Sequence, residues 1–565
     1  MKQFTRWLIA ISAVLLPFSA IADVTKYTLV IDREQVNITG KTVERITING
    51  GIPGPILEFT EGDEAVIHVV NKLDEPTSVH WHGLLLPPEM DGVPGLGGYE
   101  AIKAGETFTY RFPLRQNGTY WYHAHSGTQE QDGHYGALVI YPKDEPVVQA
   151  DRDYVVLLSD FSNEIGQQIF HNLKKSPHYY NYSQRTVSDF FGEVREHGLA
   201  SAWQDVRPWG QMRMSPTDLA DVRYDAFLVN GQTNEQNWTG LFKPGERVRL
   251  RFINASAMSM YDVRIPGLQM TVIQADGQYI EPVTVDEFRF AVAETYDVIV
   301  TPEADQAYTI AAESIDRTGF ALGTLAPREG MKGMVPAHRP RSLLTMADMG
   351  HDMDHGDHQM SQADSMDHSG HDMHGDDHQA MQEDEPAEMQ SGWADASTPE
   401  GHKALQYSDL RSLGTQDDLR PAEREIVVKL GGTMERFIWT LNGHKYGDPG
   451  FEPIKLNYGE RVRLIFKNET MMAHPMHLHG MFVQLENGQP GEKLPNKHTV
   501  NVAPGTEYSV LLTADEPGEW AFHCHLLYHM SAGMMSSVVV AEYDEDDLPA
   551  APPAQQEMGG HHDHH

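Results

Sequence analysis

Apolar and charged residues alternate at matching places along the chain. Residues 247–252 read Arg-Val-Arg-Leu-Arg-Phe, and residues 461–466 read Arg-Val-Arg-Leu-Ile-Phe. A period of two is typical of β-strands that bury one face. Because Gly and Pro turns separate these short strands, the pattern predicts an all-β chain of antiparallel β-sandwiches.

The strands belong to a frame that occurs three times. In each copy an Asn-Gly pair precedes a second glycine, and another Asn follows nine residues after that glycine. The anchors are Asn49, Gly62 and Asn71, then Asn230, Gly245 and Asn254, then Asn442, Gly459 and Asn468. Three copies in 565 residues predict three similar domains, over residues 23–145, 150–328 and 420–545. Residues 167–219 form an insertion in the second copy, and the sequence indicates no function for it.

Histidine pairs distinguish the first and third copies from the second. Residues i and i+2 of a strand share a face, so each His-x-His pair directs two imidazoles to one place. Eight such imidazoles predict a metal cluster held between the first and third copies, whereas four unrelated surface pairs are the ordinary alternative. The second copy has Val263 and Ile265 at the first of these positions. The four pairs are His80 with His82, His123 with His125, His477 with His479, and His523 with His525.

Cys524 is the only cysteine, so it forms no disulfide within the chain. His529 follows five positions later and Met534 ten positions later, while His474 stands just ahead of the third histidine pair. Two His, one Cys and a weak axial Met form a blue-copper site. A buried structural cysteine is the alternative.

The neighbours of Cys524 give this strand a second role. Alternation directs Cys524 to one face of the strand and directs His523 and His525 together to the other face. One strand is therefore expected to bind a single copper on one side and further copper on the opposite side.

Together the four motifs resemble those of the multicopper oxidases, across all three copies. The resemblance implies three cupredoxin-like Greek key domains and four copper ions, of which one is type 1, one is type 2 and two are type 3. It implies type 1 ligands at His474, Cys524, His529 and Met534. It implies type 2 ligands at His80 and His477. It implies type 3 ligands at His82, His123 and His525 for one copper, and at His125, His479 and His523 for the other.

The resemblance also implies the reaction. Electrons removed one at a time would enter at Cys524 and pass along its strand to the histidine cluster, where O2 is reduced to water. Asp91 matches an acidic residue that serves proton delivery in this family. A turn residue ahead of Gly92 is the alternative for Asp91.

Four further stretches are similar to the periplasmic copper-resistance protein A family. They are residues 172–176, 186–191, 209–218 and 523–530. This likeness implies Cu(I) and O2 as substrates, and other periplasmic copper-handling proteins as partners. Two alternatives stay open, a laccase-like oxidase of phenols and a copper-sequestering protein in which oxidation is secondary.

The composition changes abruptly between the second and third copies, over residues 340–400. Residues 346–389 hold eight Met, seven His and thirteen acidic residues, with no Lys, Arg or aromatic residue. Thioethers suit Cu(I) and imidazoles suit Cu(II), so this segment is expected to be a disordered copper-binding linker rather than a solvated spacer. The auxiliary ligands expected here are Met349, His351, Met353, His355, His368, His371, Met373 and His374. The acidic tail, residues 546–565, ends in a further His cluster.

The chain begins like a Sec-type secretory signal over residues 1–22. Lys2 and Arg6 precede a short apolar run that ends in small residues, and that run is too short to span a bilayer. The formal charge of −38 argues against nucleic-acid binding and favours the attraction of cations. A periplasmic monomer without a membrane span is therefore expected. The signal lacks the twin arginine common in the copper-resistance family, which favours metal loading after translocation.

Deletion of residues 346–389 tests where the core copper lies. The shortened protein should retain about four coppers per chain and the intense blue absorption of a Cys–Cu(II) bond, because its expected ligands all lie outside the deletion. Metal analysis and visible absorption measure both quantities, with the full-length protein as control. Loss of the blue absorption in the shortened protein would contradict the assignment of His474, Cys524 and His529.

Overall fold

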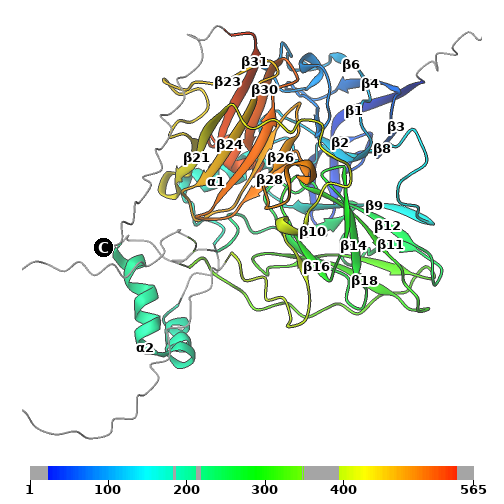
Figure 1. Ribbon diagram of the computed structural model, residues 1–565. Coiled ribbons are helices and arrows are strands. Elements are labelled where there is room, and N and C mark those ends of the chain that lie inside the picture. Colours follow the sequence, from blue (N-terminus) through cyan, green and yellow to red (C-terminus); the bar gives the residue numbers. More distant parts are fainter. Residues whose placement is uncertain (1–22, 182–185, 212–217, 346–347, 349–392, 544–565) are drawn as a thin grey trace, which may run out of the picture.

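The three copies of the sequence frame form three pairs of β-sheets. The computed structural model describes residues 23–181, 186–211, 218–345, 348 and 393–543. Figure 1 shows the third repeat, in orange and red, beside the first, in blue, with the second, in green, below them. The all-β, three-repeat fold expected from the strand pattern is confirmed, while the domain limits given above stay predictions.

The first repeat contains two four-stranded sheets, in the orders β2-β1-β4-β6 and β3-β8-β7-β5. Its strands are β1 (Val24–Asn37), β2 (Thr42–Ile48), β3 (Leu57–Thr60), β4 (Glu64–Asn71), β5 (His80–His82), β6 (Thr107–Pro113), β7 (Gly118–His123) and β8 (Tyr135–Tyr141). A short 3-10 helix, η1 (Pro88–Met90), precedes Asp91. One apolar cluster joins the two sheets, with Leu29 of β1 and Leu138 of β8 among its fully buried members.

The second repeat contains two six-stranded sheets, in the orders β10-β9-β12-β17-β14-β15 and β11-β19-β18-β13-β16-β20. Its first sheet has β9 (Arg152–Phe161), β10 (Ala226–Val229), β12 (Val248–Asn254), β14 (Met270–Ala275), β15 (Gln278–Val285) and β17 (Thr295–Val300). Its second sheet has β11 (Trp238–Leu241), β13 (Tyr261–Arg264), β16 (Glu287–Phe290), β18 (Tyr308–Ser314), β19 (Phe320–Ala326) and β20 (Ala404–Leu405). The strand β20 returns to this sheet from beyond the Met- and His-rich segment.

The third repeat contains a six-stranded and a five-stranded sheet, in the orders β22-β21-β24-β29-β26-β27 and β23-β31-β30-β25-β28. The first has β21 (Arg424–Thr433), β22 (Ile438–Leu441), β24 (Arg461–Asn468), β26 (Val483–Leu485), β27 (Asn496–Lys497) and β29 (Glu507–Thr513). The second has β23 (Ile454–Asn457), β25 (His474–Leu478), β28 (Thr499–Val502), β30 (Gly518–Cys524) and β31 (Met535–Ala541). The repeat also contains η3 (Tyr407–Asp409), η4 (Met434–Arg436), η5 (Gly491–Lys493) and the short α3 (Leu527–Ser531).

One detail of the expected sheets needs correction, because they are mixed rather than purely antiparallel. The first strand of each repeat pairs in parallel with a later one, namely β1 with β4, β9 with β12 and β21 with β24. In the first repeat the chain passes through β3 in the opposite sheet before it enters β4. The strand β4 therefore enters its sheet from the same end as β1, and alternation along one strand does not reveal this.

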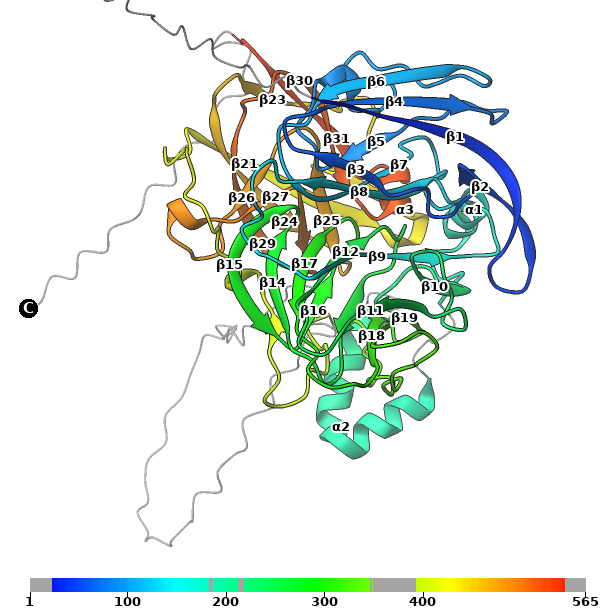
Figure 2. The same cartoon turned by 90° about the vertical axis from the view of Figure 1, so that its right-hand side faces the viewer.

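Two helices longer than α3 accompany the strands. Within the insertion of the second repeat lie α1 (Gly166–Lys175) and α2 (Val187–Gln211), and α2 bends at Gly198, which has a φ of 83°. Figure 2 shows α2 beyond the edge of the second repeat. Among the described residues, no helix is both long and apolar enough to cross a bilayer.

A buried ion cluster joins the first repeat to the second. Asp297 of β17 is 1% exposed, and its Oδ2 accepts hydrogen bonds from Arg249 Nε at 2.9 Å and Arg251 Nη1 at 3.1 Å. The same oxygen accepts from Thr119 Oγ1 of β7 at 3.0 Å. Removing one member of such a cluster leaves a buried charge without its partner. Asp297 therefore holds two repeats together.

Asp297→Ala should lower the free energy of unfolding by about 3–5 kcal/mol, because the buried Arg249 loses its carboxylate partner. Arg251 keeps its ion pair with Asp153. The midpoint of urea denaturation measures this loss. Asp305→Ala is the matched control, since Asp305 forms a surface ion pair with Arg328, and it should leave the midpoint nearly unchanged. Equal midpoints for the two variants would contradict the structural role given to Asp297.

Candidate metal centre

Strand pairing brings the two histidine motifs of each repeat together. In the first repeat β5 and β7 are antiparallel, and His80 lies opposite His123. In the third repeat β25 and β30 are antiparallel, and His477 lies opposite His523. Since residues i and i+2 share a strand face, each pairing directs its histidines to the same side of the sheet.

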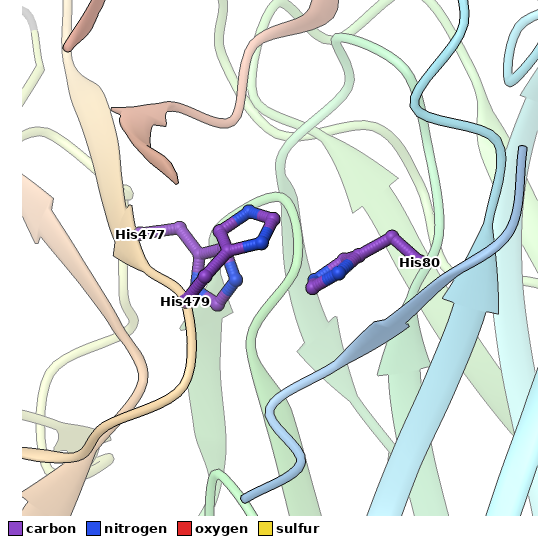
Figure 3. Close-up of side chains that lie close together, drawn as sticks. All are labelled: His80, His477 and His479. Atoms are coloured by element: carbon purple, nitrogen blue, oxygen red, sulfur yellow. The ribbon is translucent and has the colours of Figure 1, made fainter. Parts of the chain in front are cut away.

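The histidines of the first and third repeats meet face to face. The rings of His80 and His479 stack with centroids 3.8 Å apart, and those of His82 and His477 stack at 3.8 Å. Figure 3 shows His477 and His479 on one ribbon, with His80 on the facing ribbon. Segments some 400 residues apart in the sequence therefore form one site, as the histidine pairs predict.

The described residues contain several three-residue groups whose donor atoms all lie within 4.8 Å of one another. Two of these groups match the expected type 3 sets, and a third combines the expected type 2 ligands with His479. These groups are His82, His123 and His525, then His125, His479 and His523, then His80, His477 and His479. The structure therefore brings all eight motif histidines together.

Burial lowers the pKa of seven of these imidazoles. Desolvation lowers the pKa of His523 to about 4 and moves the pKa of six others well below the ordinary value. A neutral imidazole has one nitrogen lone pair available, which copper requires. The six are His82, His123, His125, His477, His479 and His525.

Oxygen acceptors hold Nδ1 of several of the cluster histidines. Nδ1 of His80 donates to the carbonyl oxygen of Asp91 at 2.8 Å, and Nδ1 of His479 contacts Asp91 Oδ2 at 2.8 Å. Nδ1 of His123 contacts Glu130 Oε2 at 2.7 Å. Nε2 of His80, His123 and His477 has no hydrogen-bond partner among the described residues. An imidazole whose Nδ1 is hydrogen-bonded to an oxygen and whose Nε2 has no partner can bind a copper ion through Nε2, so these rings fit copper at the centre.

The residues expected to bind blue copper form a second group, which contains His474, Cys524 and His529. Nδ1 of His474 lies 3.5 Å from Cys524 Sγ, and Nδ1 of His529 lies 3.9 Å from the same sulfur. Burial raises the pKa of the Cys524 thiol. A thiol that resists ionisation needs the positive charge of a metal to become a thiolate, so this donor set also fits copper.

Further contacts orient these ligands. Nε2 of His474 contacts Thr470 Oγ1 at 2.7 Å, and Nε2 of His529 contacts Asp221 Oδ2 at 2.6 Å. The fully buried Met534 accepts a hydrogen bond from Cys524 N through its backbone oxygen at 3.1 Å. Both imidazoles therefore direct Nδ1 toward the sulfur.

Asp91 lies at the centre, 3% exposed and in contact with His80 and His479. Its expected role in proton delivery stays a prediction. Asp221 and Glu130 were not predicted, because neither acid stands in a copper motif. Asp221 is 308 positions from His529, and Glu130 follows seven positions after His123. His498, a ninth histidine at the cluster, stands in no His-x-His pair. The auxiliary ligands Met349 to His374, the signal and the His-rich tail lie outside the described residues.

Comparisons with known proteins agree with this centre. Three multicopper oxidase family models match the chain, at residues 30–145, 186–328 and 419–544. The chain belongs to the multicopper oxidase family. Its fold and buried donor sets are therefore those of a copper-dependent oxidoreductase that uses O2.

The relatives of this multicopper oxidase include copper resistance proteins. It is 47% identical to copper resistance protein A of Escherichia coli, over 94% of this chain and 95% of the relative. It is 49% identical to a copper resistance protein A homolog of Pseudomonas syringae pv. tomato, over 92% of each. Among solved structures, the multicopper oxidase Fet3p, which functions in iron import, matches with a TM-score of 0.65 at 19% identity, over 92% of this chain and 90% of that one. The last likeness concerns the fold alone.

Asp91→Ala should weaken copper binding at the histidine cluster by about 10–100-fold, because His479 loses the carboxylate that orients it. His80 keeps its acceptor, which is the backbone carbonyl oxygen of residue 91. Copper content during dialysis against a chelator measures this, and the blue absorption reports the separate site at Cys524. Asp144→Ala, at an exposed position, is the control. If the Asp91 variant kept its cluster copper as tightly as the control, Asp91 would have no orienting role.

Proposed function

We propose that this multicopper oxidase oxidises Cu(I) to Cu(II) in the periplasm. Four Cu(I) ions, one O2 and four protons give four Cu(II) ions and two waters. The observation that carries the proposal is a pocket beside His529, which is lined by three thioethers and a carboxylate.

The pocket has the donors that Cu(I) favours. Met258, Met260 and Met472 line it together with Asp221. Thioether sulfur is a soft ligand suited to Cu(I), and a carboxylate stabilises the more highly charged Cu(II) product. Asp221 Oδ2 also lies 2.6 Å from His529 Nε2. The side chain of Asp221 would therefore connect a cuprous ion bound in this pocket to the proposed blue-copper ligand His529.

The Met- and His-rich segment begins and ends near this pocket. Trp393, the first described residue after the segment, lines the pocket. Its backbone N–H donates to Asp348 Oδ1 at 3.1 Å, so the two flanks of the segment are joined there. We therefore infer that the segment collects copper, with Met349, His351, Met353, His355, His368, His371, Met373 and His374 as auxiliary ligands, and releases it to the pocket.

The proposed core ligands follow the donor groups. We assign His474, Cys524, His529 and Met534 to type 1 copper, and His80 and His477 to type 2 copper. We assign His82, His123 and His525 to one type 3 copper, and His125, His479 and His523 to the other. When bound, these coppers supply one-electron oxidation and the four-electron reduction of O2.

The chain's own residues connect the two sites. Cys524 is joined by peptide bonds to His523 and His525, so a single strand links the blue site to the histidine cluster. Asp91 contacts two cluster histidines from a buried position, which supports its proposed role in proton delivery. Periplasmic location is supported by the signal-like composition of residues 1–22.

Sequestration is the second candidate function. The eight Met and seven His of residues 346–389 could hold copper without turnover. If deletion of this segment left Cu(I) oxidation unchanged while cellular copper tolerance collapsed, sequestration would be favoured. If Cu(I) oxidation fell instead, the segment would serve the enzyme.

Met258→Leu keeps the side-chain volume and removes one thioether. The ratio of kcat/KM for Cu(I) to kcat/KM for a phenol should fall about tenfold, equivalent to about 1.4 kcal/mol. Oxygen uptake measures both rates, and Cys524→Ser provides the background. Met334→Leu, at a position 85% exposed, is the matched control. An unchanged ratio would contradict Cu(I) binding at this pocket and favour the phenol oxidase.

A further inference from the structure

Trp439 is a buried aromatic residue outside the copper motifs. It lies on β22 of the third repeat and is 1% exposed. Its ring stacks on the imidazole of His529, with centroids 4.0 Å apart and an interplanar angle of 29°. The same indole meets the imidazole of His474 edge to face, with centroids 5.2 Å apart. One side chain therefore contacts both imidazoles of the group around Cys524.

The neighbouring strand leaves room for the indole. Gly432 of β21 lies directly opposite Trp439 in the antiparallel pair with β22. A Cβ atom on Gly432 would lie 2.6 Å from Cε3 and 3.2 Å from Cζ3 of the indole. The shorter of these separations is far inside the usual contact distance of carbon atoms. The glycine therefore allows the indole of Trp439 to lie against β21 beside His529.

The backbone of Trp439 holds the loop between His529 and Met534. Its N–H donates to the carbonyl oxygen of Ala532 at 3.5 Å. Gly533 has a φ of +122°, and a Cβ atom there would lie 2.8 Å from the carbonyl oxygen of Trp439. The loop therefore packs closely against β22, which brings His529 within reach of the indole.

Two contacts of different kinds restrain the ring of His529. Asp221 Oδ2 lies 2.6 Å from Nε2 and fixes the direction of that nitrogen. A single hydrogen bond leaves the ring free to turn about the line of that bond, and the stacked indole removes this freedom. Nδ1 then lies 3.9 Å from Cys524 Sγ. The plane of the imidazole is thus set by Trp439, and its direction by Asp221.

The indole also changes the electrostatics of the site. The face of an aromatic ring is electron-rich and attracts cations, and tryptophan has the strongest such face among the side chains. A copper-bound imidazole carries more positive charge when the copper is Cu(II) than when it is Cu(I). Nε1 of the indole is buried without a hydrogen-bond partner among the described residues, and a phenylalanine would avoid that cost in free energy. A tryptophan at this position therefore indicates a role beyond filling space.

We propose that Trp439 is a positioning residue of the electron-entry site. It fixes the plane of the His529 imidazole. Its electron-rich face also stabilises Cu(II) over Cu(I) at His474, Cys524 and His529, which lowers the reduction potential of that copper. A lower potential favours onward transfer of the electron to the histidine cluster. This inference rests on the proposed type 1 assignment, and it is independent of the substrate.

Trp439→Leu and Trp439→Phe test the proposal in the full-length, copper-loaded protein. A redox titration followed at the blue absorption measures the reduction potential, and electron–nuclear double resonance measures the couplings of the two histidine nitrogens. The potential should rise in both variants, and it should rise more in the Leu variant, which loses the stack and should also change one nitrogen coupling. The Phe variant keeps a smaller ring against His529, so its couplings should stay close to those of the wild type. Trp238→Leu is the matched control, because that indole packs against Tyr154 in the second repeat.

A potential in the Leu variant no higher than that of the control, or nitrogen couplings equal to those of the control, would overturn the role of Trp439. Should the Leu variant fail to accumulate with its blue absorption, the potential of the Phe variant decides. A wild-type protein without the blue absorption would instead overturn the type 1 assignment. The two failures are therefore distinguishable.

Discussion

The centre depends on one constraint, which is that each buried imidazole must keep a lone pair directed at a shared space. Burial lowers the pKa of seven of the eight rings, and a neutral ring can present either nitrogen. Oxygen acceptors remove that freedom by holding Nδ1, as Asp91 does for His80 and His479 and as Glu130 does for His123. The layers of strands around the site serve to hold these acceptors as much as the histidines themselves.

The second repeat meets this constraint without contributing a motif histidine. Asp276 anchors the loop next to His477, and Asp221 contacts His529 of the blue site. Met258 and Met260 line the pocket beside that histidine. A repeat without a motif histidine therefore still supports the histidine cluster and the group around Cys524.

The histidine pairs could be predicted from the sequence because strand geometry fixes their directions. Alternation requires His80 and His82 to share a face, and the same argument separates Cys524 from its two neighbours. The supporting contacts could not be predicted, since Asp221 and His529 are 308 positions apart and nothing near either residue indicates the other. No histidine lies two positions from His498, so strand alternation did not mark His498 as a residue of the cluster. The parallel pairing of β1 with β4 depends on the path between sheets, which a local pattern does not contain.

The stacking of His80 on His479 has a consequence for biosynthesis. Half of the cluster's imidazoles belong to the first 125 residues, and the other half begins at His477. The first repeat would therefore present only four of these histidines until the third repeat packs against it. Such a half-site is open to any divalent ion that suits imidazole, including nickel and zinc. Which metal the cluster binds would thus depend on whether metal arrives before or after the two repeats come together, as well as on the ligands.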